Sequence, residues 1–237
     1  MPARFPTTSW SLVIASAGSP GDQSKQALAS LCERYWYPLY AFIRRQGHDP
    51  DQARDLTQDF FVRLLEKNYV GQADQRRGRF RTFLLTAVKH FLLNEADHAS
   101  AKKRGGAHVI LPIELVIAEQ SYQLEPSHDA TPEKLFERNW AVTLLQTVTD
   151  QLQREFIQAG KAKQFESLKP MLTGESEGIR YSEIAKELGL SEGAVKVAIH
   201  RLRRRFRELL RQEVAETIAD PRLVDEEIHF LSDVLAR

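Results

Sequence analysis

The sequence predicts an all-α protein with two helical domains joined by a flexible linker. Apolar residues recur at helical spacing along most of the 237 residues, and no segment alternates as a half-buried strand would. Residues 102–130, between the two helical blocks, begin with basic and glycine residues and end with proline, serine and aspartate. This composition is typical of a linker, although its apolar middle is able to dock on a surface.

The predicted helices follow from the breaks between them. The first block runs from about Ser24 to Ala99, with breaks at 47–50 and 71–78, and Pro38 should kink or restart its helix. The second block runs from about Pro132 to Arg211, with a glycine-bearing break at 174–178, and 222–237 forms one more short helix. The predicted organisation is an N-terminal extension at 1–27, a first domain at 28–101, the linker at 102–130, a second domain at 131–211 and a C-terminal extension at 212–237.

Composition narrows the class of protein. Hydrophobic residues make up 42% and charged residues 27%, which is typical of a soluble globular chain. The single cysteine, Cys32, excludes an intramolecular disulfide and any cysteine-rich metal site. No apolar run approaches the roughly 20 residues that span a bilayer, so we expect a cytoplasmic protein that contacts no membrane.

The most specific pattern in the chain is YSEIAKELGLSEGAVKVAIHRLRRR, residues 181–205. Ile184, Ala185 and Leu188 predict a short amphipathic helix that Gly189 ends by taking a positive φ. Leu190 is expected to face the core, and Ser191 is a good N-cap for a second helix. Val195 and then Ile199 or Leu202 continue the apolar face. This is the spacing of a DNA-binding helix-turn-helix, here between residues 181 and 205.

The second of these helices ends in a ladder of arginines. Its N-terminal half can meet base edges in a major groove, and the arginines from Arg201 to Arg205 can neutralise phosphates. The alternative is a helical hairpin whose arginines form a solvated face. The coincidence of the turn pattern with the basic ladder favours DNA binding.

A second basic segment, from Gly78 to Gly106, interleaves aromatic and basic residues. Basic groups beside aromatic rings suit a single strand, because bases stack while phosphates are held. The alternative is equally open at this point, since Phe83, Leu84 and Phe91 also have the spacing of a core face. His90, Asp97, His98 and His108 lack the spacing of a ligand set, so we expect no metal site and no cofactor.

The order of these segments resembles that of a bacterial extracytoplasmic-function (ECF) sigma factor, over roughly Leu28 to Leu210. YWYPLYAFIRR followed by DQARDLTQDFFVRLLEK resembles the helices that bind core RNA polymerase, and GRFRTFLLTAVKHFLLNEADHASAKKRGG resembles the segment that reads and melts the −10 element. The helix-turn-helix resembles the −35 reader. The opening FPTTSWSLV and the C-terminal extension are similar to those of a subgroup frequent in planctomycetes and similar bacteria. The first domain would then be the sigma region 2 bundle, and the second would be region 4.

The resemblance implies three sets of site residues and no catalytic residue. The set that meets the coiled coil of the polymerase β′ clamp is Asp51, Asp55, Gln58, Asp59 and Phe60. The set in the −10 region is Arg79, Phe80, Arg81, Lys89, His90, Asn94 and Asp97. The set that meets the −35 duplex is Ser191, Glu192, Ala194, Lys196, His200, Arg201 and Arg204.

The acidic row Asp51, Asp55 and Asp59 departs from the family pattern at Arg54, where many members carry a second acid. A cation there weakens attraction to a basic polymerase face by about 1 kcal/mol or less if it is exposed. Phosphorylation of Thr57, one helical turn away, would add roughly −1.5 to −2 charge and an acceptor for Arg54. We therefore hypothesise that Thr57 is a site for a Ser/Thr kinase, with an anti-sigma factor as the less favoured regulator. The alternative is that Thr57 is a packing residue.

Three other classes of function compete with the sigma factor. One is a helix-turn-helix regulator that binds duplex DNA without joining polymerase. Such output domains usually follow an α/β receiver, and no βα alternation is visible here. Another is an enzyme, for which the sequence offers no glycine-rich phosphate loop, nucleophile elbow or paired metal ligands. The third is a structural helical adaptor, which would have to explain the arginine ladder without DNA. We expect a binding protein rather than an enzyme.

Overall fold

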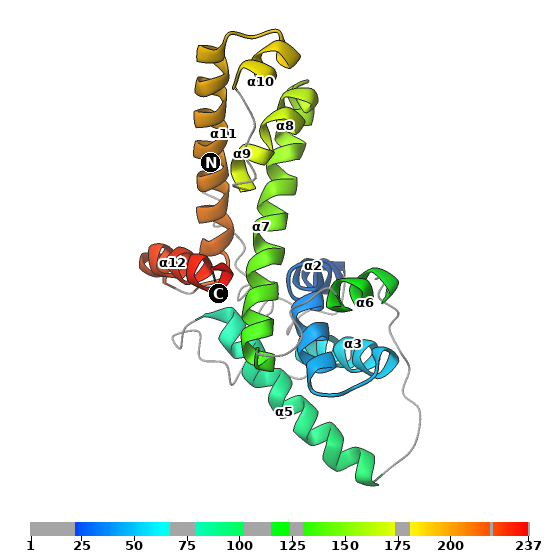
Figure 1. The fold of residues 1–237 in the computed structure, drawn as a ribbon. Coiled ribbons are helices and arrows are strands. Elements are labelled where there is room, and N and C mark those ends of the chain that lie inside the picture. Colours follow the sequence, from blue (N-terminus) through cyan, green and yellow to red (C-terminus); the bar gives the residue numbers. More distant parts are fainter. Residues whose placement is uncertain are drawn as a thin grey trace. The chain divides into compact units, whose positions relative to one another are not determined.

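The structure is a computed structural model that describes residues 22–66, 79–101, 115–123, 130–173, 181–218 and 220–236. Within these ranges the chain is helical, and its nearest approach to a strand is an isolated antiparallel bridge between Arg79 and Ile218 (Figure 1). The all-α fold class is therefore confirmed. No helix in the same ranges is long and apolar enough to cross a membrane. The helices are α2 (Asp22–Arg45), α3 (Pro50–Glu66), α5 (Phe80–Ala101), α6 (Leu115–Gln123), α7 (Pro132–Gln158), α8 (Ala162–Leu168), α9 (Pro170–Thr173), α10 (Tyr181–Leu188), α11 (Glu192–Ala215), the 3-10 turn η2 (Pro221–Leu223) and α12 (Val224–Leu235).

The chain divides into two compact units. Unit 1 comprises residues 1–143 together with 214–237, and unit 2 comprises residues 144–213. This division places residues 131–143, at the start of the predicted second domain, and residues 214–237 of the predicted C-terminal extension in unit 1. The reason is apolar burial: Phe136 and Trp140 of α7, and Leu231 of α12, are buried.

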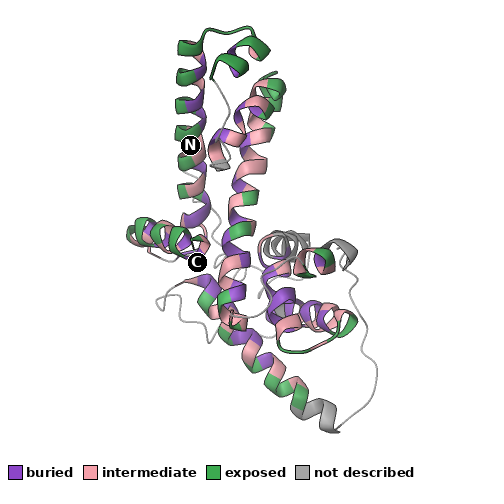
Figure 2. Ribbon diagram, in the orientation of Figure 1, coloured by how far each residue is buried: buried purple, intermediate pink, exposed green. Residues whose placement is uncertain are grey.

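The core of unit 1 is rich in aromatic side chains. Tyr35 and Phe42 of α2, Phe61 of α3 and Phe80 of α5 are at most 1% exposed. The Tyr35 and Phe80 rings lie 5.3 Å apart, which joins α2 to the start of α5. Figure 2 shows this buried surface continuing along the sides of the helices that face each other.

Pro38 does not restart its helix. It lies inside α2, which is assigned as one helix from Asp22 to Arg45. Trp36 before Pro38 and Leu39 after it are buried. Proline cannot donate a backbone hydrogen bond, and the tertiary packing of this face compensates for the one that the helix lacks.

Part of the predicted linker forms a helix that docks on unit 1. α6 packs against α3, and the carboxylate of Glu119 accepts hydrogen bonds from the Tyr40 hydroxyl at 2.7 Å and from Arg44 Nη2 at 2.8 Å. The Arg44 guanidinium also lies over the Tyr122 ring, 4.9 Å from its centroid. Residues 115–123 of the predicted linker are thus attached to unit 1. The predicted breaks at 71–78 and 174–178 lie outside the described residues.

Candidate nucleic-acid and protein-binding surfaces

The helix-turn-helix forms as its spacing predicts. Gly189 follows α10 with φ +65°, and the N–H of Leu190 donates to the carbonyl of Ala185 at 2.9 Å. The Ser191 hydroxyl oxygen accepts a hydrogen bond from the Ala194 N–H at 3.2 Å and caps α11. Ile184, Val195 and Ile199 are buried, so the two helices share one core.

The turn corrects one expectation from the sequence. Leu190 is 39% exposed rather than directed into the core. Together with Val197 and Arg201 of α11 and Phe156 of α7, it lines an open groove within unit 2. The left-handed turn at Gly189 places the next residue at the rim of the core, which the periodic pattern of α10 does not reveal.

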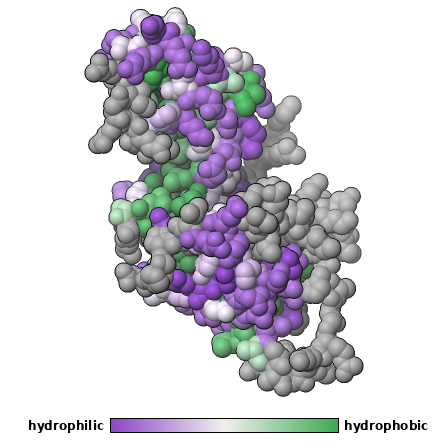
Figure 3. Space-filling model, turned by 45° about the vertical axis from the view of Figure 1, so that its right-hand side comes forward, coloured by the Kyte–Doolittle hydropathy of each residue, from purple (hydrophilic) through white to green (hydrophobic). Residues whose placement is uncertain are grey.

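The predicted −35 set lies largely on the exposed side of α11 and the turn before it. Ser191, Glu192, Lys196, His200, Arg201 and Arg204 are exposed and Ala194 is half-buried. Figure 2 shows exposed residues along one side of α11, and Figure 3 shows hydrophilic side chains over most of unit 2 in that view. Val197, 50% exposed, adds an apolar group to this surface.

The arginines of the ladder are not equivalent. Arg205 pairs with Glu155 of α7, with Nη2 2.6 Å from Oε1, and also with Glu208. Arg203 donates from Nε and Nη2 to the carbonyl of Met171 in α9. Both therefore join α11 to its neighbours in unit 2. Arg201 and Arg204 remain on the exposed side, although Arg204 also pairs with Glu208.

The acidic row on α3 carries its own counter-ion. Arg54 Nη1 lies 3.2 Å from Asp51 Oδ1, and Arg54 Nη2 lies 3.0 Å from Asp55 Oδ1. Arg54 thus partly neutralises two of the three aspartates. The side chains of Asp51 and Asp55 are 76% and 44% exposed, so both stay accessible to a partner.

The other residues assigned to the polymerase surface are less accessible. Asp59 is half-buried, whereas Gln58 and Phe60 are buried at 7% and 3% exposure. Thr57 is fully buried, and its hydroxyl donates to the carbonyl of Ala53 at 2.6 Å. Both Thr57 and Phe60 lie on the packed side of α3, while Asp51 and Asp55 lie on the open side.

The residues predicted to read the −10 element divide between the core and the surface. Phe80 is fully buried and Arg81 is 4% exposed, so this conformation presents neither side chain to DNA. Phe91 is buried as well, as the alternative core interpretation of this segment requires. His90 and Asn94 are exposed beside Leu93, which is 66% exposed. The Asp97 side chain lies outside the described residues.

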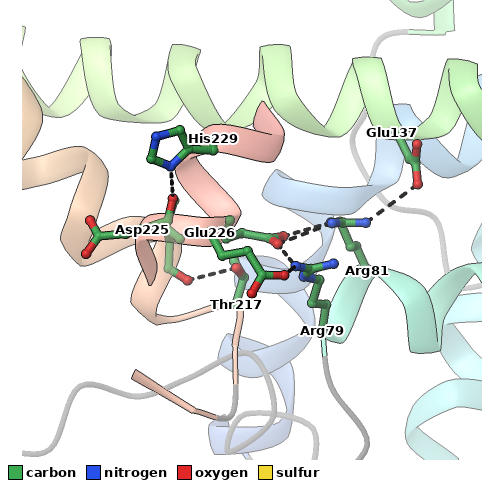
Figure 4. Close-up of polar contacts among 9 residues, drawn as sticks. Arg79, Arg81, Glu137, Thr217, Asp225, Glu226 and His229 are labelled. Carbon is green, nitrogen blue, oxygen red and sulfur yellow. Dashed lines mark hydrogen bonds and ion pairs between the residues drawn. The ribbon is translucent and has the colours of Figure 1, made fainter. Parts of the chain in front are cut away.

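Acidic residues from elsewhere in unit 1 hold the cations at the start of α5. Glu227 of α12 accepts hydrogen bonds from Arg81 Nε at 2.8 Å and from Arg81 Nη2 at 3.2 Å. Figure 4 shows Arg79 and Arg81 pointing toward the carboxylates of α12. Arg79 pairs with both Glu226 and Glu227. Further along α5, Lys89 pairs with Glu133 at 2.7 Å, and this interaction lowers the pKa of the Glu133 carboxyl.

Sequence reasoning missed Glu226 and Glu227 as partners of these cations. The only sign of them was the acidic character of residues 220–227 near the end of a chain with basic segments. The acidic character of this segment does not indicate which of the basic segments Glu226 and Glu227 pair with. Among the described residues, no group of three histidine, cysteine or carboxylate side chains is placed to hold a metal ion.

Comparisons with known proteins match the two parts of the chain separately. Residues 31–101 match the family model described as Sigma-70 region 2, and residues 176–206 match the one described as Sigma-70, region 4. The chain is 26% identical over 181 residues to the ECF RNA polymerase sigma factor SigE of Mycolicibacterium smegmatis. That alignment covers 76% of this chain and 60% of the relative, so the chain spans less than two thirds of the relative's length. No solved structure matches.

Proposed function

We propose that the chain is an ECF sigma factor that binds core RNA polymerase and directs promoter recognition, strand opening and transcription initiation. The observation that carries this proposal is the combination of a formed helix-turn-helix within the region 4 match and a region 2 match that lies in the other helical unit, unit 1. Sigma factors of this family are initiation factors without enzymatic activity, and the matches agree with the expectation of a non-enzymatic protein.

In this proposal α3 binds the polymerase and α11 binds the −35 duplex. Asp51 and Asp55 present carboxylates to a basic partner, here the coiled coil of the β′ clamp. On α11, Glu192 and Lys196 are positioned to contact base edges, whereas Arg201 and Arg204 contact phosphates. On α5, His90 and Asn94 are the accessible members of the −10 set.

The proposal assigns the chain to the subgroup frequent in planctomycetes, and it includes phosphorylation of Thr57 as a regulatory step. The burial of Thr57 restricts how that step occurs. A kinase requires an accessible hydroxyl, so phosphorylation needs α3 to open locally first. Arg54, engaged by Asp51 and Asp55 before modification, is the cation that would then meet the phosphate.

Binding to purified core polymerase tests the proposal through Arg54→Ala. Because this change frees Asp51 and Asp55, we expect affinity for polymerase to rise by up to about fivefold, the equivalent of one exposed ion pair. Lys134→Ala, which removes an exposed cation elsewhere in unit 1, is the matched control and should leave affinity unchanged. Transcription from a fork-junction promoter with the same polymerase tests initiation.

The second candidate is a regulator that binds duplex DNA without polymerase, and the helix-turn-helix alone would support it. It predicts that the chain shifts promoter DNA but neither binds core polymerase nor supports transcription from the fork junction. Such a result would overturn the sigma-factor proposal.

A further inference from the structure

Three of the four basic or histidine residues predicted to read the −10 element are paired with carboxylates of the same chain. Arg79 pairs with Glu226 and Glu227, Arg81 with Glu227 and Glu137, and Lys89 with Glu133. All of these carboxylates come from α7 or α12, outside the region 2 match at 31–101. Carboxylates of unit 1 therefore pair with the same cations that would have to contact the phosphates of a bound nucleic acid.

The pair between Arg81 and Glu227, the central pair, is the most buried of these ion pairs. Their side chains are 5% and 0% exposed. The Arg81 guanidinium lies 3.9 Å from the centroid of the Phe230 ring and 5.0 Å from that of Trp140. A carboxylate and two rings thus enclose this cation, which anchors α12 to α5.

The chain leading into α12 follows the same surface. The Phe80 N–H donates to the carbonyl of Thr217 at 3.0 Å, and Glu216 pairs with Arg34 of α2 at 2.5 Å. Val224, Leu231 and Val234 are buried and provide the apolar part of the contact. Residues 214–218 and 220–236, the C-terminal segment, therefore pack on the rest of unit 1 through backbone, apolar and ionic contacts together.

The outer ion pairs are more accessible than the central one. Arg79 and Glu226 are 27% and 64% exposed, and Lys89 and Glu133 are 43% and 38% exposed. Exposed pairs of this kind contribute little and are screened by salt. They can exchange a carboxylate for a phosphate before the central pair opens.

We propose that the C-terminal segment, with Glu133 of α7, is an intramolecular competitor of nucleic acid at α5. Its carboxylates occupy Arg79, Arg81 and Lys89 in the free chain, and a single strand displaces them starting from the outer pairs. The inference rests on the proposed function, because it concerns the segment assigned to the −10 element. It adds that these intramolecular ion pairs weaken DNA binding by the free chain.

Binding of the full-length chain to a single-stranded 20-nucleotide oligothymidine, without polymerase, tests the competition. Glu133→Gln and Glu226→Gln keep the shape of each side chain but remove its charge. Each should raise affinity by up to about fivefold.

Asp233→Asn is the matched control. Asp233 is exposed on the same helix α12, and its replacement changes the net charge by the same amount. It should leave the affinity for the oligonucleotide unchanged. If Glu133→Gln and Glu226→Gln bind no better than Asp233→Asn, or if no variant binds the oligonucleotide at low salt, the inference is wrong.

Hydrogen exchange of the unsubstituted chain provides a second measurement that needs no mutation. With saturating oligothymidine, the amides of residues 224–235 should lose protection, because the helix is displaced from α5. Unchanged or greater protection would show that the C-terminal segment is a permanent part of unit 1 and would overturn the inference.

Binding of the same proteins to core polymerase is measured in parallel. If the chain binds polymerase but α12 stays protected, only this inference is wrong. If the chain does not bind polymerase, the proposed function itself is wrong.

Discussion

Glu119 of α6 and Arg44 of α2 form a paired contact that fastens part of the predicted linker to unit 1. Arg44 Nη2 donates to Glu119 Oε1 at 2.8 Å and Arg44 Nε donates to Oε2 at 3.0 Å. Both side chains are less than 20% exposed, at 17% for Arg44 and 18% for Glu119. Such a bidentate pair orients both groups and gives α6 one defined position on α2.

The first prediction concerns the pH dependence of this contact. The hydrogen bond from Arg44, followed by that from Tyr40, holds the pKa of Glu119 below its usual value, while desolvation opposes the shift. A carboxyl with a lowered pKa in the folded state stabilises the fold above its unfolded pKa, and this contribution is lost as the pH falls through the folded pKa.

Glu119→Gln should therefore lower the free energy of unfolding by about 1–3 kcal/mol at pH 7. The difference between the variant and the parent chain should shrink below about pH 4, as Glu119 becomes protonated in the parent. Urea unfolding at a series of pH values checks this. A difference that stays constant from pH 7 to pH 3 would contradict it.

The second prediction is that Arg81 stabilises the fold of the free chain through its pair with Glu227. Arg81→Ala leaves the buried Glu227 carboxylate without its main partner, which should cost about 3–5 kcal/mol of unfolding free energy. Arg79→Ala, at a more exposed pair, should cost about 1 kcal/mol or less. Unfolding monitored by circular dichroism compares the two variants. Replacing both Arg81 and Glu227 by Met and Leu should recover part of the loss, and equal costs for Arg79→Ala and Arg81→Ala would contradict the assignment.

The third prediction separates two arginines of the ladder. Arg201→Ala removes a cation from the exposed side of α11 and should lower affinity for all promoters and reduce the salt slope by about 0.9. Arg205→Ala breaks the pair with Glu155 and should mainly lower the stability of unit 2, by about 1 kcal/mol or less. Filter binding at several salt concentrations, with a thermal melt of each variant, distinguishes these effects. Identical salt slopes for the two variants would exclude this division of roles.

The fourth prediction addresses Thr57. Thr57→Val keeps the volume of the side chain and loses only the hydroxyl bonded to Ala53, so unfolding free energy should change by about 1 kcal/mol or less. Thr57→Glu buries a carboxylate and should destabilise the chain by more than about 2 kcal/mol, which makes it a poor imitation of the phosphorylated residue.

Phosphorylation itself is tested with Thr57→Val as the control. If Thr57 is the regulatory site, a Ser/Thr kinase that activates transcription by the parent chain should have no effect on the valine variant. Equal activation of both chains would leave Thr57 as a packing residue.

Local sequence determined the helix-turn-helix almost completely. Its start and end signals lie within a few residues of the positions they control. Gly189 supplies the positive φ, Ser191 supplies the cap, and the spacing of Ile184, Val195 and Ile199 defines the buried side. The helical character of the first block and the acidic row on α3 follow from similarly short patterns.

Composition could not separate the two interpretations of α5. Phe80 and Arg81 carry the residue types of a strand-binding surface, yet both are buried. The same residues satisfy the spacing of a packing face, and only the side chains that meet them decide between the two. In this chain, one of those side chains is Glu227, 146 residues away from Arg81 in sequence.

The sequence by itself therefore determined the fold class, the turn that builds the DNA-binding motif and which residues carry charge. Only the tertiary structure decided which charges are available to a partner. Arg54 is shared between two aspartates, Arg205 is held by Glu155, and Arg81 is enclosed by α12. The physical reason is that helix formation depends on neighbours three or four residues apart, whereas ion pairing depends on distance in space.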